Sequence, residues 1–181
     1  ILGTGPGVGQ NSVALESFIK NNDFLVIALN TQNSIDTNLI DVRIACHPLR
    51  LLADKLEYVK FPQPLITPVS MLPVEVTDAL TGMTLFDYGI GMNIDGFEFY
   101  ENHCSVPASM VMAYALAVAT SGKAKRILLA GFDGYPGEDP RNSENKHVFQ
   151  SYLNNESSLE CISITPTRYD LKVQSVYGII S

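Results

Sequence analysis

The sequence has no tryptophan, only three cysteines and no run of basic residues. Cys46, Cys104 and Cys161 are far apart and form no C-x-x-C pair, so the sequence predicts neither a disulfide framework nor a thiolate zinc site. We therefore expect a reducing, cytoplasmic setting. The 19 acidic and 12 basic residues give a net charge of -7, which repels a phosphate backbone. Nucleic acid is not an expected partner.

Long hydrophobic runs are also lacking. The longest, residues 110–119, is too short for a membrane span of about 20 residues, and no basic region with an apolar signal core opens the chain. We expect no membrane partner. Ile1-Leu2 resembles the tail of a strand, so we expect a C-terminal domain cut from a longer protein. The 181 residues predict a single domain, residues 1–181, whose core needs no disulfide or metal.

The composition, 46% hydrophobic and 17% charged, favours strands that are covered on both faces. Apolar runs predict buried strands at residues 24–29, 42–46, 65–69 and 127–130, with Ile1-Leu2 as a fifth. Helical periodicity lies between them, at residues 12–20 and in a helix that begins at Pro48 and is marked by Leu49, Leu52, Leu56 and Val59. This alternation predicts an α/β, three-layer Rossmann-like fold with a mostly parallel sheet.

The clearest predicted helix covers residues 107–121. Ser105 is its expected cap, Pro107 lies in its first turn, and Gly122 is placed for a left-handed terminal residue. Its side chains leave almost no polar face, so we expect it to be buried against the sheet. Residues 131–145 predict a long loop, 146–153 a short helix and 161–164 a strand, while 176–180 form either a last strand or the start of a missing segment.

A glycine-rich turn, Gly3-Thr4-Gly5-Pro6-Gly7-Val8-Gly9, follows the first predicted strand. Without side chains, its backbone amides can approach a phosphate at the start of the next helix. The spacing departs from the dinucleotide fingerprint G-x-G-x-x-G, because Val8 stands at the third glycine and Pro6 stiffens the turn. A purely structural tight turn is the alternative.

Polar residues follow the next two strands. Asn30 ends the second strand, where a dinucleotide site would carry an acid, and its amide suits a ribose or base edge; the alternative is a turn or cap. His47 ends the third strand and could act as an acid or base, or be structural. Arg50, one helical turn on, could meet a phosphate or remain solvated.

Asp133 follows the strand at residues 127–130 and reaches the same edge of the sheet. With Glu138 or Asp139 it could bind sugar hydroxyls or a divalent cation, although turn chemistry explains Asp133-Gly134 nearly as well. We predict no metal site. The remaining candidates, His103, His147, Tyr100 and Tyr135, have no spacing that forms a triad or a ligand set.

Several segments resemble the C-terminal module that follows an HMG-CoA-lyase-like aldolase domain, of the 4-hydroxy-2-oxovalerate aldolase type, in bacterial surface-polysaccharide proteins. They are residues 1–9, 26–31, 45–52, 122–125, 129–135 and 164–169. The resemblance implies an N-terminal aldolase-like domain of the same chain as partner, and it assigns the lyase chemistry to that TIM barrel. Because this sequence has no D-x-T-x-R-D-G or H-x-H motif of the barrel, we expect no aldolase activity from it alone.

A more distant resemblance is to bacterial sialyltransferases and MptE-like Rossmann domains. It rests on Gly3-Thr4-Gly5-Pro6, on Asn30, and on the late apolar helix and strand that lead to Asp133; Gly7 departs from the serine common there. It implies binding of a CMP- or UDP-type nucleotide or a phosphorylated sugar. The leading hypothesis is a nucleotide-sugar-binding accessory domain in surface-polysaccharide biosynthesis. The alternatives are a glycosyltransferase-like domain with His47 or His147 as base, and a degenerate Rossmann domain for assembly.

Overall fold

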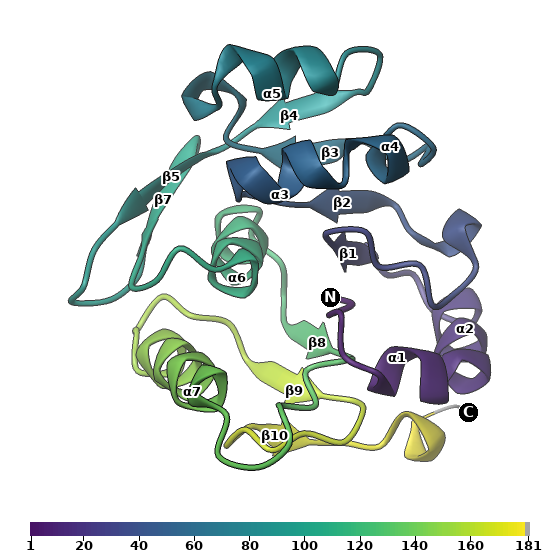
Figure 1. Ribbon diagram of the computed structural model, residues 1–181. Coiled ribbons are helices and arrows are strands. Elements are labelled where there is room, and N and C mark those ends of the chain that lie inside the picture. Colours follow the sequence, from purple (N-terminus) through teal and green to yellow (C-terminus); the bar gives the residue numbers. More distant parts are fainter. Residues whose placement is uncertain (180–181) are drawn as a thin grey trace.

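A computed structural model describes residues 1–179, in which strands and helices alternate (Figure 1). The central strands are β1 (Ile27–Leu29), β2 (Val42–Ile44), β3 (Leu65–Thr67), β4 (Leu85–Asp87), β8 (Ile127–Leu129), β9 (Cys161–Ser163) and β10 (Lys172–Val173). β1 to β4 pair in order, and β8 to β10 pair in order, all parallel. Leu2 bridges Ala28 on one side and Ala130 on the other, which joins both sets into one parallel sheet.

The order of this sheet is β4-β3-β2-β1-Leu2-β8-β9-β10. From Leu2 the chain adds strands outward in one direction as far as β4, then returns to the other side of Leu2 at β8. The strand order therefore reverses between Leu2 and β8. In open α/β sheets, ligands bind outside the carboxyl ends of the strands at such a switch point.

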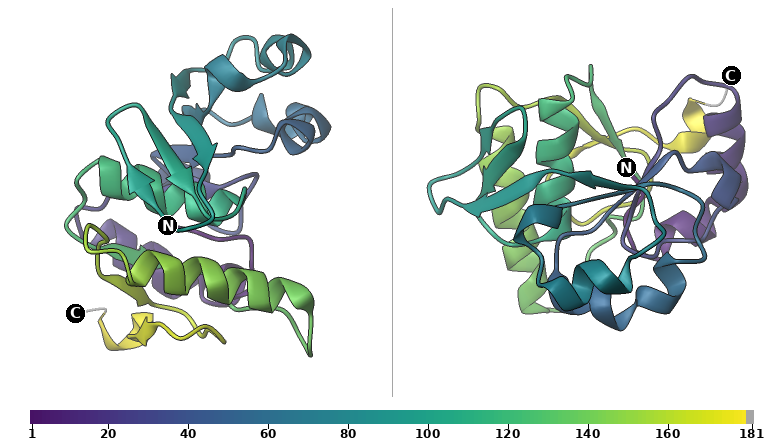
Figure 2. Two further views of the ribbon diagram at one scale, coloured as in Figure 1. Left: turned by 90° about the vertical axis from the view of Figure 1, so that its left-hand side faces the viewer. Right: turned by 90° about the horizontal axis from the view of Figure 1, so that it is seen from above.

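Helices cover both faces of the sheet. One face carries α1 (Gly7–Gln10), α2 (Ser12–Lys20), α3 (Pro48–Ala53), α4 (Lys55–Tyr58), α5 (Val74–Ala79) and the 3₁₀ turns η1 (Thr37–Leu39) and η3 (Val176–Gly178). A further 3₁₀ turn, η2 (Val69–Met71), follows β3 and contacts β4 and β5. The other face carries α6 (Val111–Ser121) and α7 (Pro140–Leu153). Figure 1 and the view from above in Figure 2 show α6 and α7 on the opposite side of the central strands from α2.

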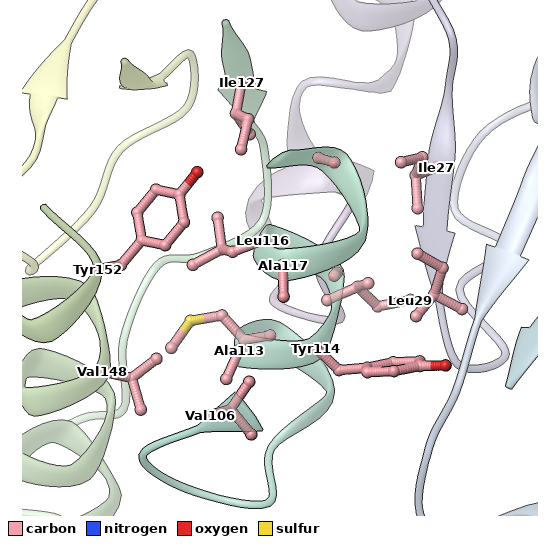
Figure 3. Close-up of a cluster of buried hydrophobic side chains, with 14 of the residues drawn as sticks. Ile27, Leu29, Val106, Ala113, Tyr114, Leu116, Ala117, Ile127, Val148 and Tyr152 are labelled. Carbon is pink, nitrogen blue, oxygen red and sulfur yellow. The ribbon is translucent and has the colours of Figure 1, made fainter. Parts of the chain in front are cut away.

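The core divides according to the two-residue period of the strands. In β1, Ile27 and Leu29 pack toward α6, whereas Ala28 packs toward α2. Figure 3 shows α6 between β1 on one side and Val148 and Tyr152 of α7 on the other. Because α6 is covered by the sheet on one side and by α7 on the other, little of its surface meets water, which explains why it is almost wholly apolar.

A small second sheet extends beside α6 (Figure 1). It consists of β5 (Gly89–Met92), β7 (His103–Val106) and β6 (Glu98–Phe99), in the order β5-β7-β6. β5 and β7 are parallel, and β6 and β7 are antiparallel. Cys104 and Val106 of β7 are fully buried in the core that contains α6.

The predicted fold class, a three-layer α/β Rossmann-like fold with a mostly parallel sheet, is confirmed. The prediction of α2 is correct to the residue, and each predicted central strand lies within one to three residues of the observed one. The prediction of a last strand at residues 176–180 is wrong where the structure describes it, because η3 occupies Val176–Gly178; Ile180 lies outside the described residues.

The start of α6 was predicted too early. The helix begins at Val111 after an extended Met110, while Ser105 belongs to β7 and Pro107 precedes the helix. Ser105 is held by its pairing with Gly91, so it cannot cap a helix. The left-handed residue at the other end is Lys123, with φ of 58°, and not Gly122, with φ of -73°.

The third and fourth helices bury a different face from the one predicted. Leu49 and Leu56 are 73% and 68% exposed, whereas Leu51 and Tyr58 are fully buried. The segment breaks at Asp54 into α3 and α4, so the spacing that marked one continuous helix does not define a single buried stripe. Similarly, α7 begins at Pro140, capped by Asp139, and shortens the predicted loop.

Candidate functional site

Two loops meet at the switch point of the sheet. The amide of Gly3 donates to the carbonyl of Ala130 at 2.7 Å, and the amide of Gly5 donates to the carbonyl of Gly131 at 3.0 Å. The amide of Gly7 donates to Oδ2 of Asp133 at 3.0 Å. The glycine turn is therefore bound along its length to the loop that follows β8.

Glycine is required in this turn because the approach is so close. A Cβ atom on Gly5 would lie 2.1 Å from Oδ2 of Asp133, and a Cβ atom on Gly7 would lie 2.1 Å from Oδ1 of the same carboxylate. On Gly3 it would lie 2.6 Å from the carbonyl oxygen of Gly131. No real Cβ makes such contacts, so these three glycines have a packing reason that is independent of any ligand.

A cavity of about 420 Å³ opens beside the two loops. Its walls come from the glycine turn, the end of β1, the first residues of α6, the loop after β8, and single residues of α7 and of the loop after β9. The lining residues are Gly3, Thr4, Gly5, Pro6, Leu29, Met110, Val111, Met112, Gly131, Phe132, Asp133, Gly134, Tyr135, Pro136, Asn145 and Tyr169. A volume of this size is in the range of small-molecule sites.

Two of the polar side chains that line the cavity, those of Asn145 and Tyr169, are bonded to each other. The Nδ2 group of Asn145 donates to the hydroxyl of Tyr169 at 2.6 Å, which orients both side chains. Burial raises the pKa of Tyr169, and nearby Tyr135 and Asp133 act in the same direction, while the bond to Asn145 opposes them. Tyr169 therefore remains a neutral phenol that can exchange hydrogen bonds with a ligand.

The loop after β8 is fixed by hydrogen bonds from α7. Asn142 accepts from the amide of Tyr135 at 2.8 Å and donates to its carbonyl at 2.9 Å. The guanidinium of Arg141 lies 3.8 Å from the centre of the Tyr135 ring. These contacts hold Tyr135 at the cavity wall, so the site is preformed in this structure.

The charge of the site is negative. Among the described residues, those that line the cavity include Asp133 but no lysine, arginine or histidine. The amides of Gly5 and Gly7 already donate to acceptors of the protein. The arrangement can therefore accept hydrogen bonds from hydroxyl or amino groups more readily than it can neutralise an anion.

Asn30 lies near the glycine turn but not in the cavity wall. It is buried, with a left-handed φ of 52°, and its amide donates to the carbonyl of Ile44 at 2.9 Å. Asparagine tolerates this conformation better than most residues, which explains it as a turn residue. Two positions on, Gln32 donates through Nε2 to the carbonyl of Gly3 and so supports the turn.

Arg43, a residue of β2, holds the segment that contains Asn30 and Gln32 in place. Its guanidinium is fully buried and donates to the carbonyl of Gln32 at 2.7 Å, to that of Asn30 at 3.3 Å, and to Oε1 of Gln63 at 3.2 Å. It also lies 3.5 Å from the centre of the Phe61 ring. Burial lowers the pKa of Arg43 to about 10. The sequence analysis missed this residue because a single arginine in an apolar strand has no distinguishing pattern.

His47 and Arg50 also lie outside the cavity. His47 is exposed in front of α3, and its carbonyl accepts from the amides of Arg50 and Leu51. Arg50 is exposed and forms an ion pair with Asp54, at 3.4 Å between Nε and Oδ2. Of the predicted site residues, the structure thus brings Gly3, Gly5, Pro6 and Asp133 into the cavity wall, with Gly7 bonded behind them.

The sequence analysis missed Asn145 and Tyr169, which complete the cavity. Both lie on segments that reach the switch point only through packing of α7 and of the loop after β9 onto the sheet. No local pattern distinguishes them. Tyr135, in contrast, was among the further candidates named from the sequence.

A larger cavity, of about 660 Å³, lies at the amino ends of the strands. It is lined mainly by apolar residues, including Ile27, Phe18 and Val118, and its few charged residues lie at Asp23, Lys125 and Arg126. The smaller cavity is the better candidate, because it lies at the carboxyl ends of the strands, at the switch point where ligands bind in open α/β sheets.

The strand order and the helices on both faces define this protein as a doubly wound α/β domain with a cavity at its switch point. Comparison with family models, with curated proteins and with solved structures finds no match. Within residues 1–179, no three histidine, cysteine, aspartate or glutamate side chains are grouped to hold a metal ion. No helix among these residues has the length and apolar character needed to cross a membrane.

Proposed function

We propose that the domain binds a nucleotide or nucleotide-sugar in the cavity at the switch point, with a sugar or ribose ring facing Asp133. The observation that carries the proposal is that Asp133, Asn145 and Tyr169 all line this cavity, with Asn145 and Tyr169 hydrogen-bonded to each other. Carboxylate, amide and phenol groups are suited to the closely spaced hydroxyls of a sugar ring.

The remaining wall suits the flat part of such a ligand. Met110, Met112 and Phe132 present apolar surface from α6 and from the loop after β8. A methionine thioether adapts to irregular shapes and makes favourable contacts with aromatic rings. A base or the carbon face of a sugar could pack against these side chains while the polar edge of the ligand meets Asp133, Asn145 and Tyr169.

The proposal is confined to binding. His47, His103 and His147, the three histidines of the chain, all lie outside the residues that line the cavity. The geometry therefore favours the accessory role over the transferase alternative with His47 or His147 as base. By its resemblance to the surface-polysaccharide proteins, the domain would hold a sugar intermediate for an aldolase-like domain of the same chain.

Thermal melting with CMP, UDP, a CMP-sugar and NAD tests the proposal. A ligand at about 100 times its dissociation constant stabilises the folded state by roughly 2.7 kcal/mol, which raises the melting temperature by about 5 to 10 °C in a domain of this size. We expect a shift with at least one sugar nucleotide or nucleotide. Absence of a shift with all four ligands would refute the proposal.

Two variants locate the site. Asp133→Asn removes the carboxylate from the cavity wall and should reduce the ligand-induced shift. Asp78→Asn removes the same charge from an exposed position on α5, outside the lining residues, and should leave the shift unchanged. Equal effects of both variants would show that the ligand binds elsewhere.

A further inference from the structure

The glycine turn already holds an anion, which is the side chain of Asp133. Oδ2 accepts the hydrogen bond from the amide of Gly7 at 3.0 Å. In many α/β domains an amide in this position meets a ligand phosphate. Here the carboxylate comes from the chain itself, from a loop that is far away in the sequence.

The carboxylate also fills the space above the turn. Its two oxygens lie so close to Gly5 and Gly7 that either would contact an added methyl group at 2.1 Å. The amide of Gly5 is directed to the carbonyl of Gly131. A phosphate could reach these two amides only by displacing Asp133 and by separating the turn from the loop after β8.

Charge works in the same direction. A phosphate in the cavity would lie beside the Asp133 carboxylate, and among the described residues no lysine, arginine or histidine lines the wall to offset the repulsion. Like charges at short range oppose each other most strongly where water is partly excluded. Asp133 is half-buried, so water screens its charge only in part.

We propose that Asp133 is the residue that determines specificity in this cavity, because it excludes phosphate from the glycine turn and accepts hydrogen bonds from ligand hydroxyl or amino groups. The inference rests on the proposed function and deepens it. The part of the ligand next to the turn is a neutral sugar or nucleoside, and any phosphate of the same ligand points away from Gly5 and Gly7.

A titration with inorganic phosphate, followed by the amide resonances of Gly5 and Gly7, tests the exclusion directly. In the wild type we expect no saturable shift of either resonance. In Asp133→Ala the amide of Gly7 should shift saturably, because the carboxylate that accepts its hydrogen bond is gone, whereas the amide of Gly5 remains bonded to the carbonyl of Gly131. A well-dispersed spectrum establishes that the variant is folded, and Asp78→Asn, which changes an exposed carboxylate of α5 and keeps Asp133, should behave as the wild type.

Two phosphate results would overturn the inference: saturable shifts in the wild type, or no shift in folded Asp133→Ala.

A second titration compares cytidine with CMP. We expect the wild type to bind both with affinities within about threefold, and Asp133→Asn to weaken cytidine binding by at least about tenfold, as expected for loss of a hydrogen bond to a charged group. The inference would be contradicted if CMP bound much more tightly than cytidine, or if Asp133→Asn left the affinity for cytidine unchanged. If neither binds and the other nucleotides also fail, the proposed function is refuted, while the phosphate titration still decides whether Asp133 excludes phosphate.

Discussion

Gly7 and Asp133 are 126 residues apart in the chain, yet the amide of the first donates to the carboxylate of the second at 3.0 Å. The contact joins the turn after the first strand to the loop after β8. Because both loops lie at the carboxyl edge of a parallel sheet, their meeting follows from the strand order. A substitution of Gly7 tests this contact.

Gly7→Ala should destabilise the protein by about 1 to 3 kcal/mol, the usual cost of forcing an extra carbon into a packed site. All three nearest atoms to the added Cβ belong to Asp133. The cost should therefore largely disappear in an Asp133→Ala background, which a double-mutant cycle by urea denaturation measures. Gly9→Ala is the matched control: its Cβ would meet Ser34 at 3.6 Å, and it should be neutral or stabilising by up to about 1 kcal/mol. Additive effects of Gly7→Ala and Asp133→Ala would contradict the assignment.

Arg43→Lys should cost about 2 to 3 kcal/mol of unfolding free energy, because an ammonium cannot reproduce the planar set of donors to Gln32, Asn30 and Gln63. Chemical denaturation checks the value. Arg126→Lys, at an exposed position, should change stability by less than about 0.5 kcal/mol. A cost at Arg43 no larger than at Arg126 would mean that the buried guanidinium does not hold the segment that contains Asn30 and Gln32 in place.

The three thiols should be inert in the folded protein. Burial raises the pKa of Cys46, Cys104 and Cys161 from 9.0 to about 12, so at pH 8 each remains a shielded thiol. A disulfide reagent such as DTNB should react with none of them under native conditions and with all three in denaturant. Rapid reaction of any thiol in the native state would be inconsistent with this burial.

The same thiols make stability fall at alkaline pH. Between pH 9 and about 12 they lose protons in the unfolded chain but keep them in the folded one, so the unfolded state is favoured as the pH rises through this window. Replacing Cys104 by Ala should make the fall in unfolding free energy less steep. An unchanged slope would argue that Cys104 titrates alike in both states.

Leu51 and Leu49 should respond very differently to truncation. Leu51→Ala removes a fully buried side chain beneath α3 and should cost about 2 to 5 kcal/mol. Leu49→Ala, at a side chain that is 73% exposed, should stay within about 0.5 kcal/mol of the wild type. Denaturant midpoints compare the two variants. A larger loss of stability in Leu49→Ala than in Leu51→Ala would support the buried face that the sequence predicts.

The sequence predicts the central sheet well because β1, β2, β3, β8 and β9 are buried on both faces and therefore appear as continuous apolar runs. It does not predict residues 70–106. The strands there are two to four residues long and partly exposed, as in β4, where Phe86 is 53% exposed. Their pairing depends on neighbours such as β3 and β7, which local sequence does not specify.

For the site, the sequence predicts those residues that follow strands directly. Gly3, Gly5, Pro6 and Asp133 were placed at one edge because parallel strands end there together, and the structure brings them into one cavity wall. Asn30, His47 and Arg50 follow strands on the same edge but do not reach the cavity. The sequence predicts neither that these three residues lie outside the cavity nor that Asn145 and Tyr169 line it, because both outcomes depend on how the helices pack against the sheet.

The bridge at Leu2 has a consequence for the order of assembly. Leu2 pairs with Ala28 and with Ala130, so the first residues of the chain lie in the sheet between the β1 to β4 half and the β8 to β10 half. A contact that spans so much chain closes a large loop, and such closures slow folding. The cavity wall is built from both sides of that bridge, so neither half alone can form it. A ligand that binds this wall would therefore bind only after the two halves of the molecule have joined.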